Sequence, residues 1–94
     1  MTAAPLVLLV ALLGVGDELA EAQRAFSAGR YEDAEHLALR AARPPREGAA
    51  LYLVGLARFR TGRPAEALEA LDAAARAPDA PEPTQWSFNR GACL

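Results

Sequence analysis

The chain repeats itself with a period of about 33 residues, and this constrains its fold more than any other feature of the sequence. Alanine is so common here that matches between alanines occur by chance. The argument therefore depends on matches between rarer residues, which keep one order and one spacing: Phe26 with Phe59, Gly29-Arg30 with Gly62-Arg63, and Pro45 with Pro78. A period of this length is typical of a solenoid built from short supersecondary units.

Each unit has the pattern of two helices joined by a tight turn. Apolar and small residues recur three and four positions apart, which gives each predicted helix one inward face. Glycine can end the first helix of a unit, and proline can end or begin the second. The sequence predicts helices from Asp17 to Gly29, from about Tyr31 to Arg43, from about Glu47 to Thr61-Gly62, and from Pro64 to a point before Pro78. The inward face predicted for the last helix consists of Ala67, Leu68, Leu71, Ala74 and Ala75.

These units resemble the tetratricopeptide repeat, a helix-turn-helix of about 34 residues. The residues that match the first copy are Ala22, Phe26, Gly29, Tyr31, Ala34 and Ala41, and those that match the second are Gly55, Phe59, Gly62, Ala67, Leu71 and Ala74. Pro64 replaces the turn aromatic, and Asn89-x-Gly91 looks like the middle of a third first helix. The resemblance implies an all-α fold in which antiparallel helix-turn-helix repeats stack as a short right-handed α-solenoid over residues 17–94. The repeats would cover about 17–46 and 47–80, with a partial copy at 84–94.

The N-terminal segment has a different composition. Residues 3–16 carry no charge, and Asp17 follows at once. The run is too short for a transmembrane helix, which needs about 20 apolar residues, and its length is typical of the hydrophobic part of a signal peptide. Small residues precede Asp17, although residues 1–5 lack the usual Lys or Arg. We expect residues 1–16 to be a signal peptide and the protein to be exported, either periplasmic or extracellular. The alternatives are membrane association through residues 3–16 and a buried hydrophobic first helix.

Composition argues against several classes of function. Ten basic and twelve acidic residues, with no block of like charge, give none of the basic surface that binding of nucleic acid requires. One cysteine, Cys93, and one histidine, His36, can form neither an internal disulfide nor a Cys/His metal site. The polar cluster Glu32, Asp33, Glu35 and His36 is explained by the helix dipole, which favours acidic residues in a first turn. The sequence predicts no enzyme, no metal, no cofactor and no small-molecule substrate.

The resemblance implies a protein-interaction role. First helices of successive tetratricopeptide units line a concave groove that holds a peptide or a partner helix. The groove residues carried over are Gln23, Phe26 and Ser27, then Tyr52, Leu56, Phe59 and Arg60, and finally Gln85 and Phe88. Phe26 and Phe59 fit equally well as packing residues inside their own units. Leu19 and Leu53 stand where relatives that clamp a C-terminal carboxylate have polar groups, which argues against that ligand.

A second hypothesis concerns the C-terminal end. A repeat array generally needs about three units and polar caps, and here two units and part of a third are recognisable. Nothing in the pattern covers Trp86 and Leu94. The alternative role is therefore an assembly or oligomerisation subunit that joins a second copy or another protein through this end. The chain could equally be a fragment of a longer repeat protein, and the identity of the partner stays open.

Overall fold

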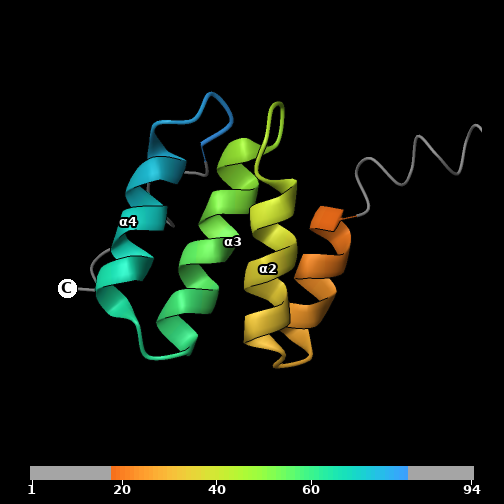
Figure 1. Ribbon diagram of the computed structural model, residues 1–94. Coiled ribbons are helices and arrows are strands. Elements are labelled where there is room, and N and C mark those ends of the chain that lie inside the picture. The colour runs from red at the N-terminus through yellow and green to blue at the C-terminus, as the bar shows by residue number, and fades with distance from the viewer. Residues whose placement is uncertain (1–17, 81–94) are drawn as a thin grey trace, which may run out of the picture.

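The computed structural model describes residues 18–80, and these residues form helices and turns without a strand. The first helix covers residues 18–27, and α2 (Tyr31–Ala41), α3 (Glu47–Arg60) and α4 (Pro64–Ala75) follow. In Figure 1 the helices lie side by side, from the first helix in orange at one edge to α4 in cyan at the other. α3 packs against both α2 and α4. The prediction of an all-α solenoid of antiparallel helical hairpins is confirmed.

The two hairpin turns share one backbone geometry. The N–H of Gly29 donates to the carbonyl oxygen of Phe26 at 3.0 Å, and the N–H of Arg30 donates to that of Ala25 at 2.9 Å. The second turn repeats both bonds at matching positions, at 3.1 and 2.9 Å. Gly29 has a φ of 82° and Gly62 a φ of 78°, the left-handed conformation that ends a helix in a Schellman motif and that glycine adopts without strain. The predicted helix ends at these glycines are therefore correct.

Small residues let the helices approach each other closely. The buried core consists mostly of alanine, and Leu71 and Val54 are its largest fully buried side chains. A Cβ atom added to Gly55 would lie 2.6 Å from Cδ2 of Leu71 and 3.2 Å from the carbonyl oxygen of Ala67. Both distances are tighter than ordinary van der Waals contact, so α3 meets α4 at a point where no side chain fits.

Two details of the predicted helices are wrong. α2 ends at Ala41 instead of Arg43, because Pro44 disfavours the α conformation of the residue before it. The inward face of α4 includes Ala70, which is buried, whereas Ala75 is exposed. The buried positions of α4 follow a strict three-and-four spacing through Ala70, and Ala75 lies outside that stripe.

The start of α3 is held by a residue that follows α4. Oδ1 of Asp79 accepts a hydrogen bond from the N–H of Gly48 at 2.7 Å, and Oδ2 accepts one from the N–H of Ala49 at 3.2 Å. Burial alone would raise the pKa of Asp79, but these backbone hydrogen bonds lower it below its ordinary value of 3.8. The carboxylate satisfies two N–H groups that have no partner within the helix. It thereby ties the two ends of the α3–α4 hairpin together.

No helix within residues 18–80 is long and apolar enough to span a membrane. The predicted signal peptide at 1–16 and the partial repeat at 84–94 lie outside the described residues.

Candidate functional site

The first helix and α3 present predicted groove residues at helical spacing. Tyr52, Leu56, Phe59 and Arg60 follow one another four, three and one positions apart, so they share one face of α3. Phe59 is 38% exposed and Arg60 is exposed, whereas Leu56 and Tyr52 are half-buried. On the first helix, Gln23 and Ser27 are exposed and Phe26 is half-buried. These residues give the array an accessible face of mixed apolar and polar character.

A cluster of two rings and one guanidinium connects the two hairpins on this face. The rings of Phe26 and Tyr31 meet edge to face, with centroids 5.1 Å apart and planes at 68°. Arg60 reaches over both rings, with Cζ 5.6 Å from the centroid of Phe26 and 5.9 Å from that of Tyr31. These distances fall within the range of about 6 Å for cation–π attraction. Arg60 of α3 is thus held against the first helix and the start of α2.

The two phenylalanines matched by the repeat have different environments. Phe26 packs against two core clusters as well as Tyr31, so it serves both core and surface. Phe59 is one of the exposed large hydrophobic residues of the part described. The sequence had placed Phe59 on the inward face of its helix as readily as in the groove, and its exposure argues against a core role.

Tyr52 has a packing role besides its predicted place in the groove. It lies half-buried against the cluster of Ala67 and Leu71, at the contact of α3 with α4. A substitution of Tyr52 would therefore disturb the hairpin as well as the accessible face, which makes Tyr52 a poor probe of binding. Leu56 and Phe59 are better probes, since neither belongs to a buried cluster of residues 18–80.

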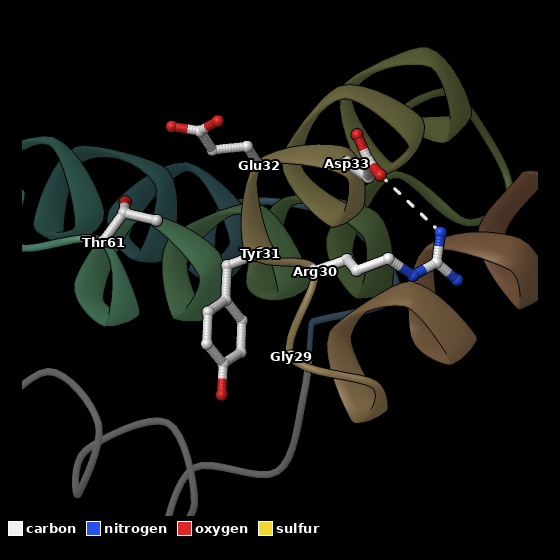
Figure 2. Close-up of a pocket in the computed structure, with 6 residues that line it drawn as sticks. All are labelled: Gly29, Arg30, Tyr31, Glu32, Asp33 and Thr61. Atoms are coloured by element: carbon white, nitrogen blue, oxygen red, sulfur yellow. Dashed lines mark ion pairs between the residues drawn. The ribbon is translucent and has the colours of Figure 1, made fainter.

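A cavity of about 360 Å³ lies at the turn end of this region, lined by Gly29, Arg30, Tyr31, Glu32, Asp33 and Thr61. Figure 2 shows the ring of Tyr31 and the carboxylate of Glu32 pointing to opposite sides of the start of α2. Arg30 forms an ion pair with Asp33 at 3.6 Å, drawn as a dashed line in Figure 2. Two carboxylates at the helix N-terminus already answer its dipole, so the cavity disfavours an anionic ligand.

The joint between α2 and the second hairpin contains a buried carboxylate. Glu35 is 7% exposed, and its Oε2 accepts a hydrogen bond from Nε of Arg58 at 2.7 Å. Arg63 donates to both oxygens of Glu35. Burial raises the pKa of Glu35, but the hydrogen bonds from Arg63 and Arg58 outweigh it and hold the pKa below the ordinary value of 4.5. Glu35 therefore stays ionised and links α2 to α3 and to the second turn.

This joint was missed by the sequence analysis, which assigned Glu35 to a cluster favoured by the helix dipole. A signal was available, because the repeat places Glu35 opposite Leu68, and a charge at an apolar position needs a partner. The rest of that cluster is solvent-facing: Glu32, Asp33 and His36 are all exposed. Among residues 18–80, no group of three His, Cys, Asp or Glu side chains could hold a metal ion.

The remaining predicted positions, Gln85 and Phe88 of the groove and Trp86 and Leu94 of the assembly end, lie outside the described residues.

The comparisons with known proteins agree with the repeat geometry. The family model of the tetratricopeptide repeat matches residues 19–94, which is most of the chain. The chain belongs to the tetratricopeptide repeat family. Neither the comparison with curated proteins nor that with solved structures gave a match. Tetratricopeptide repeats are generally modules for protein–protein interaction and are typically non-catalytic, so the family gives the class of function and leaves the partner open.

Proposed function

We propose that this chain is a non-catalytic interaction module that binds a peptide or a partner helix along the groove face, defined as Gln23, Phe26, Ser27, Tyr52, Leu56, Phe59 and Arg60. The observation that supports this most directly is the exposure of Phe59. An aromatic ring that is 38% exposed on a helix whose other large residues are mostly covered is a natural contact for an apolar side chain of a partner. Polar neighbours on both helices can orient that partner.

The test uses the full chain as bait for a phage-displayed library of random linear peptides, and a selected peptide is then titrated by fluorescence anisotropy. We expect Leu56→Ser and Phe59→Ser each to weaken binding at least tenfold. The matched control is Leu39→Ser, because Leu39 is 43% exposed but lies on α2, outside the groove face. Binding that Phe59→Ser leaves unchanged, or that Leu39→Ser weakens equally, would contradict the proposal.

Export is a separate proposal, which the uncharged run at residues 3–16 and the small residues before Asp17 support. The full chain would be expressed in a bacterium, and the mass of the product in the exported fraction would be measured. A product that begins at Asp17 is the expected result. An intact N-terminus in the cell interior would overturn the proposal.

A further inference from the structure

The groove face carries a single charged residue. Among its members, only Arg60 is ionic, and none is a carboxylate. Neighbouring arginines have acidic partners: Arg58 binds Glu35, and Arg63 binds Glu35 and lies 3.7 Å from Glu66. In the part of the chain that the structure describes, Arg60 contacts rings alone. Its positive charge is therefore left for something outside residues 18–80.

The two rings fix where this charge stands. An arginine on a helix surface normally samples many rotamers, and a ligand that immobilises it loses part of its affinity to that ordering, about 0.5–1.5 kcal/mol per side chain. Phe26 and Tyr31 already attract the guanidinium from one side. A guanidinium stacked on aromatic rings keeps its N–H donors in the plane, where they can bind a carboxylate through two parallel hydrogen bonds. The cluster thus presents Arg60 in a conformation suited to an anion.

We infer that the partner segment places the side-chain carboxylate of an Asp or Glu on Arg60 and an apolar side chain against Phe59 and Leu56. This inference rests on the proposed function, since it names the chemistry of the segment that the groove face takes. The apolar residue follows from the surface that lies one turn or less from Arg60: Leu56 precedes it by four positions, and Phe59 is adjacent and exposed.

A carboxylate fits this surface better than a phosphate. A phosphoryl group carries about two negative charges and is bound by clusters of arginine. Here one guanidinium stands among apolar and uncharged residues, which balances one negative charge. The second charge of a phosphate would have to be desolvated without a partner.

The experiment compares peptide variants on the full chain. A peptide selected from the library is synthesised in three forms, with Asp, Asn or phosphoserine at its acidic position, and each is titrated by fluorescence anisotropy. For the wild-type chain we expect the Asp form to bind at least tenfold more tightly than the Asn form, and this ratio should shrink as salt is raised. For Arg60→Gln we expect the two forms to bind within about twofold of each other. Arg60→Lys should give an intermediate ratio, because it keeps the charge but loses the planar fork.

The matched control is Arg76→Gln, which removes the same charge from an exposed position after α4, away from the groove face, and should leave the tenfold ratio intact. Selected peptides that lack acidic residues, but whose binding Phe59→Ser abolishes, would overturn this inference and leave the proposed function standing. A phosphoserine form that binds tighter than the Asp form would overturn the choice of carboxylate. A library that gives no binder would overturn both proposals.

Discussion

The contact between Gly55 and Leu71 makes a prediction about two residues that can be tested as a pair. A methyl group on Gly55 would lie 2.6 Å from Cδ2 and 2.7 Å from Cγ of Leu71, and Leu71 is fully buried. Gly55→Ala therefore has two opposing effects. Alanine favours the helix over glycine by about 0.5–1 kcal/mol, while overpacking of a filled core costs about 1–3 kcal/mol. We expect a net loss of up to about 2 kcal/mol in the free energy of unfolding.

The sign should reverse when Leu71 is shortened. Leu71→Ala removes the atoms that collide with the new methyl group, and by itself it should cost about 2–5 kcal/mol because it leaves a cavity. In that background Gly55→Ala retains the helix gain and fills part of the cavity. The double variant should therefore be more stable than Leu71→Ala alone by about 0.5–1 kcal/mol. The coupling between the two sites is expected to be about 1–3 kcal/mol.

The first hairpin supports this expectation. The positions that match Gly55 and Leu71 are Ala22 and Ala38, both fully buried in one cluster. The double variant Gly55→Ala/Leu71→Ala gives the second hairpin the same pair of alanines. One hairpin solves the packing problem with two medium residues, and the other solves it with the smallest residue opposite a large one.

The assay is urea unfolding of the full chain, followed by far-UV circular dichroism, for the wild type, both single variants and the double variant. Destabilisation by Gly55→Ala of the same size in both backgrounds, to within about 0.5 kcal/mol, would refute the reasoning. The close approach to Leu71 would then not be what requires glycine at position 55, and the carbonyl oxygen of Ala67, at 3.2 Å, would be the next candidate.

Three further predictions follow from the turns and buried carboxylates. Gly62→Ala should lower the stability by about 1–2 kcal/mol in a urea titration, because the φ of 78° is strained for any residue with a Cβ. Glu35→Gln should cost about 1–3 kcal/mol at neutral pH, since two guanidinium groups lose their charged acceptor, and an unchanged midpoint would contradict the joint. Asp79→Ala should cost about 0.5–2 kcal/mol at neutral pH. Because the folded-state pKa of Asp79 lies below 3.8, this difference from the wild type should be full above that pH and disappear as the pH falls through the folded-state pKa; a difference that persists in acid would count against the cap.

Local chemistry made much of the fold predictable. Gly29 and Gly62 mark helix ends because a left-handed residue is needed there, and Pro64 marks a start because a first helical position needs no N–H donor. These effects act within a few residues, so a single sequence reveals them.

The joints between hairpins were not predictable in the same way. Arg58 is 23 residues from Glu35 in the chain, and Gly48 is 31 residues from Asp79. No local pattern says which of several arginines will meet a given carboxylate, and an aspartate after a helix has many uses. Only the structure brings these partners together.

The groove face shows most clearly what a repeat pattern predicts and where it stops. The repeat equates Phe26 with Phe59, but Phe26 is followed in its turn by Tyr31, whereas Pro64 holds the matching place after Phe59. The ring of Tyr31 covers Phe26 from its edge, and proline offers no such ring to Phe59. The neighbouring position also differs, since Ser27 in the first hairpin matches Arg60 in the second. As a result the first hairpin supplies a platform of rings, and the second supplies both the guanidinium that rests on it and an open aromatic ring. The surface proposed to select a partner therefore arises from the positions at which the two hairpins differ, while their shared positions build the framework that holds these side chains in place.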